Sequence, residues 1–291
     1  MTYNTSVLKK GVDAKFHVAY RAMQAQPYLA ALARLFMIAP STGASEEYAW
    51  LGDVPGVREW IGDKTLKGLK DYDYTIKNKD FYDGFNIDRN EIEDEKIAAI
   101  MPRVEMLAQN VAKFPSELVI QIIKAAESSL AYDGVAFFAN RSVNDNLLVG
   151  TGVTAANIKA DITAARTAMM KFKSDQGRVM GLMLNTILCP PELEEIFLEV
   201  TTSVAGEATA RPAAKWINDV IVVPELEDTN DWYGFALGAP LKPFIFQNRK
   251  GVSTVIDDSQ VKRNRKIGYS AEMRGNAGFG FPQMAIKVTN A

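Results

Sequence analysis

The residues from 56 to 95 form a segment that is too charged for a protein core but is patterned like β-strand. Apolar and polar side chains alternate in it, which is typical of strands with one apolar and one solvated face. The apolar members of the pattern are Tyr72, Tyr74, Ile76, Phe81, Phe85 and Ile87. A two-stranded ribbon is marginal by itself in water, so another part of an assembly is expected to cover this face. The pattern therefore favours a subunit over a solitary enzyme.

Composition excludes several kinds of chemistry. The chain has 291 residues and a net charge of −2, which allows two domains, or one domain with long extensions, and argues against a basic nucleic-acid binder. Cys189 and His17 are the single members of their types, so a disulfide framework, a cysteine or histidine metal site and a Ser-His-Asp triad are not expected. We expect no cofactor and no bound metal, and Cys189 should be a small buried hydrophobe.

Motifs for catalysis are also missing. The glycines of the GNAGFG stretch at 275–280 do not have the GxGxxG order and predict a turn or a bulge in a strand. The acids at Glu192, Glu194 and Glu195 are those expected at the start of a helix. No apolar run could cross a bilayer, and the first residues lack a signal peptide, so folding in a cytoplasm is expected. We therefore predict no enzyme activity, although a small cytoplasmic enzyme built on residues 153–238 remains the alternative.

The first 45 residues are basic and helical in pattern. Apolar residues recur at helical spacing from Leu8 to Met23, and Pro27 can open a second helix that ends near Pro40. The cations that stand out are Lys9, Lys10, Lys15, Arg21 and Arg34, with Asp13 as the nearby acid. Two interpretations stay open: a solvated helical face, or an extended basic arm that lies on a neighbouring subunit or near packaged polyanion.

A long amphipathic helix is predicted from Ile92 to Leu130, because apolar residues recur there every three or four positions. Pro102 and Pro115 predict that this helix is kinked or broken into two. Acids at 91–95 suit the start of the helix, where they complement its positive end. The turn at 132–134 and the irregular residues 139–152 then mark a boundary.

Helices and strands alternate from 153 to 238, which predicts a small α/β unit. Thr154 is a plausible helix N-cap, the apolar run Met180–Leu188 predicts a buried strand, and Pro190 and Pro191 open another helix. Strands are predicted at 220–223 and 232–237, and again at 244–246, 266–274 and 284–288. The strands after Pro240 need a helix to cover them, so we expect them to pack on the long helix, with the α/β unit inserted between.

Several motifs taken together resemble one family. They are EYAWLG at 47–52, REWIGD at 58–63, YTIKNKDF at 74–81, DR at 88–89, IED at 92–94, YDG at 132–134, FF at 137–138, VVPEL at 222–226, WY at 232–233 and NAGFG at 276–280. In this order and spacing the chain, from about residue 46 to residue 283, is similar to the major head subunits of Mu-like phages and prophages, the gpT family. One departure is visible, since the family pattern has a histidine shortly after the Phe-Phe pair, where this chain has Asn140-Arg141-Ser142.

The resemblance implies an α+β chain with the Hong Kong 97-type phage capsid fold. The expected parts are an N-terminal arm at 1–48, an extended β-hairpin loop at 49–91, a peripheral domain with a long spine helix at 92–145, an axial α/β domain at 146–239 and peripheral strands at 240–291. It also implies a structural protein that assembles into hexamers and pentamers of an icosahedral shell around double-stranded DNA. An encapsulin-type compartment shell, which shares the fold, is the alternative.

The resemblance assigns roles to two groups of residues. The expected inter-subunit contacts of the extended loop are Trp60, Tyr72, Tyr74, Ile76, Phe81, Phe85 and Ile87, and the basic arm is represented by Lys9, Lys10, Lys15 and Arg21. Expected partners are further copies of the chain, the scaffold and portal proteins of the same phage, and packaged DNA through weak non-specific contacts. No membrane is expected, and assembly should take place in the cytoplasm of the bacterial host.

Overall fold

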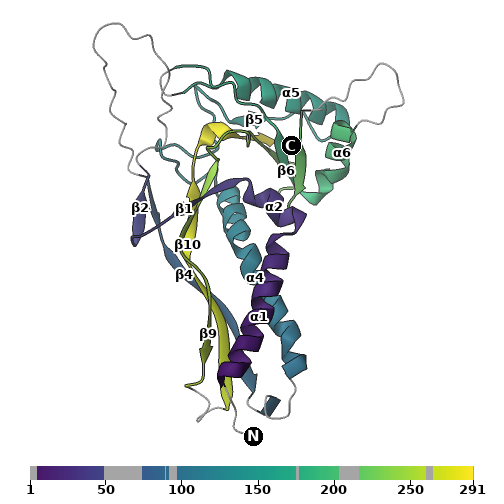
Figure 1. Ribbon diagram of the computed structural model, residues 1–291. Coiled ribbons are helices and arrows are strands. Elements are labelled where there is room, and N and C mark those ends of the chain that lie inside the picture. The colour runs from purple at the N-terminus through teal and green to yellow at the C-terminus, as the bar shows by residue number, and fades with distance from the viewer. Residues whose placement is uncertain are drawn as a thin grey trace, which may run out of the picture.

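The computed structural model describes residues 5–48, 74–88, 90–91, 97–174, 177–202, 216–259 and 265–290. These residues form an elongated lower part and a broader upper part (Figure 1). Two long helices lie beside a sheet of long strands in the lower part, and a second sheet with two further helices forms the upper part. The predicted α+β class is confirmed.

The two long helices are packed along each other. Helix α4, Ile97–Lys124, runs beside α1, Thr5–Gln24, whose Val12 and Phe16 are fully buried with residues of α4. Both helices were predicted from the spacing of apolar residues, and the structure confirms them. Pro102 and Pro115 lie inside α4, so of the two predicted outcomes, a kink or a break into two helices, the break does not occur. A proline inside a helix costs about 3 kcal/mol. Because the buried face of α4 continues on both sides of each proline, packing keeps the helix continuous.

The second helix is shorter than predicted. Helix α2, Pro27–Ala33, opens with Pro27 as expected, but the chain then forms strand β1, Phe36–Pro40. Strand β1 is parallel to the start of β9, with Phe36 opposite Phe244. The run Phe36-Met37-Ile38 favours an extended strand, since aromatic and β-branched residues pack well on a sheet.

The lower sheet has the strand order β1-β9-β10-β4. Strands β9, Phe244–Asp257, and β10, Lys266–Phe279, are antiparallel and longer than the predicted ones. Strand β4, Lys79–Asp88, pairs with β10 along its whole length. The expectation of an isolated two-stranded ribbon is therefore wrong for β4, because the long β10 offers it a neighbour that the sequence did not reveal. Helix α4 packs on β9 and β10, as predicted for the strands after 240.

A small antiparallel pair lies at the side of this sheet. It consists of β2, Ser45–Glu47, and β3, Thr75–Lys77. Residues 49–73, which connect the two strands, lie outside the described residues. The strands predicted from the alternation around Ile76 and Phe85 are thus confirmed as β3 and β4, but they belong to two different sheets.

The upper sheet has the order β5-β11-β8-β6-β7. Its strands are β5, Leu147–Val149, β11, Ala285–Thr289, β8, Trp232–Phe235, β6, Thr186–Cys189, and β7, Asp219–Val222. Helix α5, Ala155–Lys171, starts at its predicted cap, where Thr154 Oγ1 accepts a hydrogen bond from Asn157 N–H at 3.3 Å. Helix α6, Glu194–Thr202, follows the short 3₁₀ helix η1, Pro191–Leu193, and a second such turn, η2, Pro282–Met284, precedes β11.

Three expectations fail in this part of the chain. Strand β11 lies in the upper sheet between β5 and β8, although all strands after 240 were expected beside α4. The loop predicted at 139–152 contains strand β5, and the strand predicted from Met180 starts at Thr186. In each case a short apolar run gains its strand geometry from neighbours far away in the sequence, so local pattern does not determine its limits.

Candidate functional site: a surface for assembly

The base of the β2–β3 pair is held by one carboxylate. Glu46 Oε1 accepts hydrogen bonds from Gly43 N–H at 2.9 Å, from Thr42 N–H at 2.7 Å and from Ser41 Oγ at 2.9 Å. The backbone hydrogen bonds from Gly43 and Thr42, followed by the Ser41 hydroxyl, lower the pKa of Glu46. The charged form therefore fixes the tight turn that leads into β2.

Two amides anchor the same base to the lower sheet. Gln247 is fully buried on β9, and its Nε2 donates to Ile76 O at 3.2 Å and to Asn78 Oδ1 at 2.8 Å. Asn78 Nδ2 donates in turn to Ser41 Oγ and to Gly43 O. Tyr48 completes the group, because its hydroxyl donates to Gln247 Oε1 at 3.0 Å. The two ends of the 49–73 segment are thus fixed to β9 through polar side chains with satisfied partners.

Close backbone approach places β3 on β10. A Cβ atom at Gly278 would lie 2.3 Å from Ile76 Cδ1, so only glycine leaves room for this buried side chain. Tyr74 lies beside it, and its hydroxyl accepts a hydrogen bond from Phe279 N–H at 2.7 Å. Burial raises the pKa of Tyr74. The GNAGFG stretch lies in strand β10 and pairs with β9 in regular register from Gly275 to Phe279; the register shifts occur just before it, between Glu272 and Gly275.

The apolar side chains of β4 point to the helices of their own chain. Ile87 is buried with residues of α1 and α4, and Phe81 packs edge-on against Phe114 with ring centroids 4.6 Å apart. Phe85 is half-buried, with its ring centroid 6.0 Å from that of Tyr269. On the other face Tyr82 is 83% exposed.

The structure therefore corrects the reason given for the inter-subunit contacts. A neighbouring copy was expected to cover the apolar face, but Ile76 and Ile87 are covered within their own chain. Helices α1 and α4 cover Ile87, whereas Ile76 is buried in a different cluster, beside Gly278 of β10. Trp60 and Tyr72 lie outside the described residues. A contact of any of the seven predicted residues with another subunit stays a prediction.

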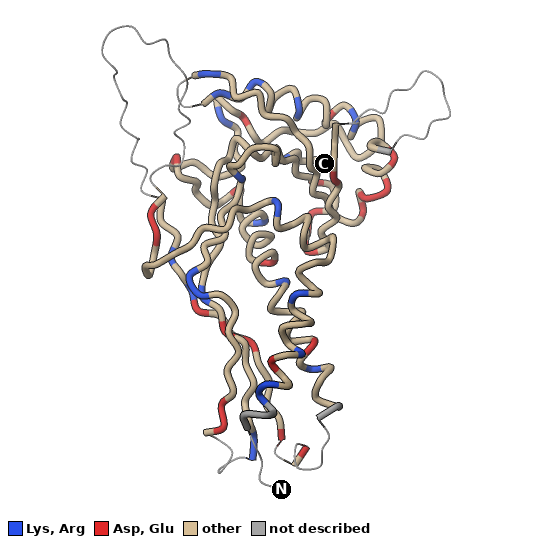
Figure 2. Tube along the Cα trace, viewed as in Figure 1, with Lys and Arg blue, Asp and Glu red and all other residues tan. Residues whose placement is uncertain are grey.

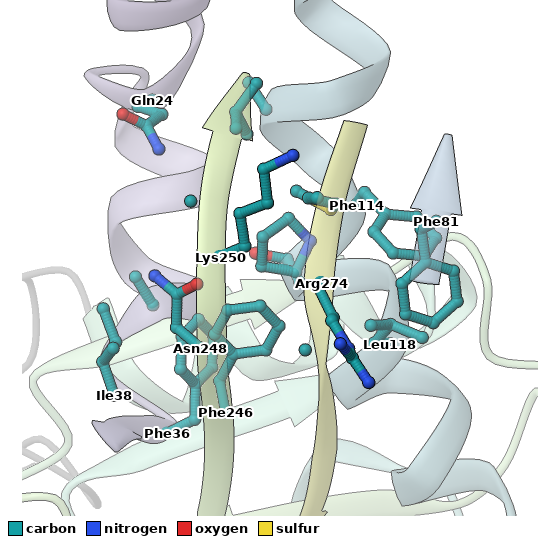
Figure 3. Close-up of a pocket in the computed structure, with 18 of the residues that line it drawn as sticks. Gln24, Phe36, Ile38, Phe81, Phe114, Leu118, Phe246, Asn248, Lys250 and Arg274 are labelled. Carbon is teal, nitrogen blue, oxygen red and sulfur yellow. The ribbon is translucent and has the colours of Figure 1, made fainter. Parts of the chain in front are cut away.

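A cavity of about 310 Å³ lies between α1, α4 and the lower sheet. Figure 3 shows Phe81 and Phe114 close together at one side of it, with Phe36 and Phe246 at another. Its polar lining includes Asn248 and two cations but, among the described residues, no carboxylate, histidine or thiol. Such a lining provides no acid–base pair for catalysis.

The cations of the predicted basic arm have different environments in the structure. Lys9, Lys10 and Arg21 are exposed on α1, whereas Lys15 forms an ion pair with Glu105 of α4. Helix α1 packs on its own chain, because its apolar face is part of the core and Asp13 accepts hydrogen bonds from Thr254 and Tyr269. Contacts of the exposed cations with a neighbour or with DNA stay a prediction.

The described residues offer no site for metal chemistry, since no group of three histidine, cysteine, aspartate or glutamate side chains among them could hold an ion. Cys189 is fully buried, as predicted. Burial, followed by the charge of Glu194, raises the pKa of its thiol to about 12, so it is not a nucleophile. Among the described helices, none combines the length and hydrophobicity that a membrane-spanning segment requires.

The anchors of the β2–β3 base were missed by the sequence analysis. Gln247 and Asn276 read as ordinary polar residues, yet Asn276 Nδ2 donates to Lys77 O at 2.9 Å and Gln247 is fully buried. The one signal that could have revealed them is the pair Gly275 and Gly278, because glycines inside a strand often mark close approach of another backbone or side chain.

Comparison with known proteins identifies the family to which the chain is similar. The chain matches the family described as Mu-like prophage major head subunit gpT over residues 5–161, 150–226 and 222–291. It is 27% identical over 255 residues to the Mu-like prophage FluMu major head subunit of Haemophilus influenzae, covering 86% of this chain and 63% of that protein. It is 24% identical over 261 residues to the major capsid protein of Escherichia phage Mu, covering 88% and 65%. The chain thus spans less than two thirds of the length of these two relatives.

A solved structure shows the same fold. The subunit in the procapsid of bacteriophage JBD30 superposes with a TM-score of 0.58 at 24% identity, over 99% of this chain and 77% of that one. The similarity includes both the elongated lower part and the upper part. The fold is therefore that of phage capsid subunits, the Hong Kong 97-type expected from the sequence motifs.

Proposed function

The chain belongs to the family of Mu-like prophage major head subunits, gpT, and we propose from this membership that it is the major capsid subunit of a tailed phage or prophage. In this role it assembles into hexamers and pentamers of an icosahedral shell that encloses double-stranded DNA. It is a structural protein and not an enzyme. The observation that carries the proposal is the family match, which extends from residue 5 to residue 291.

The structure supports this role in two ways. The subunit has its own core, so it can fold before it assembles, and it fixes both ends of the 49–73 segment to the lower sheet through Glu46, Asn78 and Gln247. Rigid attachment of a segment that contacts a neighbour lowers the entropy that binding costs. We propose 49–73 together with the partly exposed Phe81 and Phe85 as the inter-subunit surface.

The remaining assignments follow from the same role. The proposed parts are an arm at 1–48, an extended loop at 49–91, peripheral segments at 92–145 and 240–291, and an axial domain at 146–239. The proposed partners are other copies of the chain, scaffold and portal proteins of the same phage, and packaged DNA through weak contacts of Lys9 and Lys10. The shell belongs to the virion and is assembled in the cytoplasm of the host.

Sedimentation of the purified protein, followed by analysis of what the particles contain, tests the proposal. We expect particles of megadalton size that protect double-stranded DNA from nuclease when they are isolated from a producing host. Particles that contain a protein cargo instead of DNA would favour the encapsulin-type alternative. A species of one to four chains at every concentration would contradict both and favour a small cytoplasmic enzyme.

A further inference from the structure

Charge is segregated between two sides of the upper part. The residues after the N-cap of α5 carry the exposed cations Lys159, Lys171, Lys173 and Arg178, whereas η1 and α6 carry Glu192, Glu194, Glu195 and Glu199 and no cation. Figure 2 shows Lys and Arg along the top of the molecule at α5, and Asp and Glu gathered at α6. None of these four glutamates forms an ion pair with another described residue, and neither do Lys171 and Lys173.

The two charged groups lie at opposite edges of the upper sheet. Helix α6 packs against β7, which is one edge strand. At the other edge, the loop before β5 is tied to the segment after α5, because Asn144 Nδ2 donates to Lys173 O at 2.7 Å and Asn144 Oδ1 accepts from Lys173 N–H at 2.6 Å. Lys173 is therefore held beside β5, at the edge strand farthest from α6.

The basic edge is hollowed. Val143, Asn144 and Lys173 line a groove of about 410 Å³, together with the turn at Gly177 and the residues around Gln283. Val143 is 57% exposed, and Val179, which pairs with Lys173 in an isolated bridge, is 63% exposed. The groove lining is mostly polar and includes the Asp133–Arg141 ion pair and Lys173, while Val143 within it and Val179 next to Lys173 expose apolar surface. Apolar surface surrounded by polar and charged residues is the usual composition of a protein–protein contact.

The acidic edge has the matching composition. Leu198 is 44% exposed on α6, and Glu195 and Glu199 lie three residues before and one residue after it on the same helix. Acids in the first turn complement the helix dipole, which accounts for Glu194 and Glu195 but not for Glu199. Glutamates four residues apart repel each other in a lone helix, so their arrangement costs stability unless a cationic partner is present.

We propose that the acidic edge of one copy, Glu194, Glu195, Glu199 and Leu198, binds the basic edge of the next copy, Lys171, Lys173, Val143 and Val179. The inference rests on the proposed function and names the partner surface for the upper part of the subunit. A contact between two different edges of the same molecule is heterologous, and such contacts close into rings when the rotation between copies is suitable. Complementary charge sets the pairing of the edges, and the apolar centre keeps it dry.

Charge reversal tests the pairing. The variant E194K/E195K/E199K and the variant K171E/K173E should each need a roughly tenfold higher protein concentration to form particles, and the variant that combines all five substitutions should assemble like the wild type. Asp258→Lys, beyond the end of β9, is the control and should change nothing. Circular dichroism checks that each variant is folded. Reversals that assemble normally, or a combined variant that is folded but stays impaired, would overturn the proposal.

Disulfide trapping provides a readout that does not depend on charge. The wild-type Cys189 is fully buried, so new cysteines can be oxidised selectively. In particles of the double variant Leu198→Cys/Val143→Cys we expect a ladder of covalent multimers on non-reducing gels, and monomers for each single variant. Monomers alone from intact double-variant particles would refute the edge contact and leave the capsid function standing, whereas a wild type that forms no particles would refute the function itself.

Discussion

The two sheets of the molecule differ in how many of their faces are covered. Strands β6 and β8 of the upper sheet are buried at every position, with Trp232 in one core cluster and Phe235 in another on the opposite face. In the lower sheet Ile267, Tyr269 and Ala271 of β10 are buried against α1 and α4, while the alternate residues remain partly exposed. The upper sheet is thus enclosed within the subunit, and the lower sheet keeps one face free.

This difference shows how much two kinds of sequence pattern reveal about the burial of a strand. A continuous apolar run predicts a strand covered on both sides, as at Ile187 and Leu188. Alternation predicts a strand with one solvated face, as at β4, but it does not say which part of the chain covers the other face. In this subunit the helices α1 and α4 cover that face, and the opposite face of the lower sheet stays partly exposed.

The largest expected effect concerns the enclosed sheet. Phe235→Ala removes a fully buried ring that packs against Phe244, and it should lower the free energy of unfolding by about 3–5 kcal/mol. Tyr82→Ala, on the free face of β4, is the matched control and should change it by less than about 0.5 kcal/mol. Urea unfolding of the unassembled subunits measures both values, and similar losses for the two variants would remove the contrast between the sheets.

The buried ion cluster of the upper sheet comes next. Lys287 Nζ lies 2.6 Å from Asp231 Oδ2 and also pairs with Glu127, and its side chain is 8% exposed. Lys287→Met should cost about 3 kcal/mol, because Asp231 stays buried without its cation. Adding Asp231→Asn should recover part of the loss, since Asn290 N–H keeps an acceptor. A double variant no more stable than Lys287→Met would show that the charge pair is not the cause.

The same cluster makes a prediction for alkaline pH. Burial alone lowers the pKa of Lys287, but hydrogen bonds to Asp231 and Glu127 outweigh it, so the pKa is raised. This contribution to stability is therefore complete below the pKa of an unfolded lysine, about 10.4, and is lost as the pH rises through the higher value of the folded protein. Wild-type stability should fall in this range more steeply than that of the double variant, and parallel curves would contradict the assignment.

A smaller effect is expected at the boundary between the covered and the free face. Phe81 is half-buried, and its ring packs against Phe114 at one side of the cavity of Figure 3. Phe81→Ala should lower the free energy of unfolding of the subunit by about 1–2 kcal/mol, because it removes one aromatic pair and the partly buried apolar area of the ring. Phe81→Leu keeps most of the apolar area and should lose less. A loss as large as that of Phe235→Ala would place Phe81 in the enclosed core.

The smallest effect is local and lies at the base of β2 and β3. Because hydrogen bonds from Gly43, Thr42 and Ser41 lower the pKa of Glu46, this turn is stabilised above the pKa of an unfolded glutamate. The stabilisation is lost as the pH falls through the lower pKa of the folded state. Hydrogen-exchange protection of the Thr42 and Gly43 amides should therefore decrease in acid for the wild type, but not for Glu46→Gln. Protection that is independent of pH in both proteins would contradict this role.

Sequence alone predicted most of the elements but few of their neighbours. Helices α1, α4 and α5 were identified because apolar spacing and a cap such as Thr154 act within one segment. Strand β11 was assigned to the wrong sheet, since its pairing with β5 joins Lys287 to Leu147, 140 positions apart. Local propensity contains no information about such a partner.

For the candidate site, too, the sequence predicted the strands but not the residues that pack against them. The alternation from Tyr74 to Ile87 correctly indicated the strands β3 and β4, but the cover that α1 and α4 provide for Ile87 depends on tertiary packing. The anchoring amides Gln247 and Asn276 carry no pattern of their own, because a polar residue buried by its partners looks like any surface residue in sequence. The resemblance to a family predicted the capsid fold, which the pattern within single segments does not determine.

Electron cryomicroscopy of the assembled particles tests the central claim most directly. The account predicts closed icosahedral shells of hexamers and pentamers, in which β4 stays paired with β10 in every copy and the surface of 49–73, Phe81 and Phe85 meets a neighbouring subunit. Images that contain only monomers and small open oligomers, from protein whose subunits are folded, would contradict it.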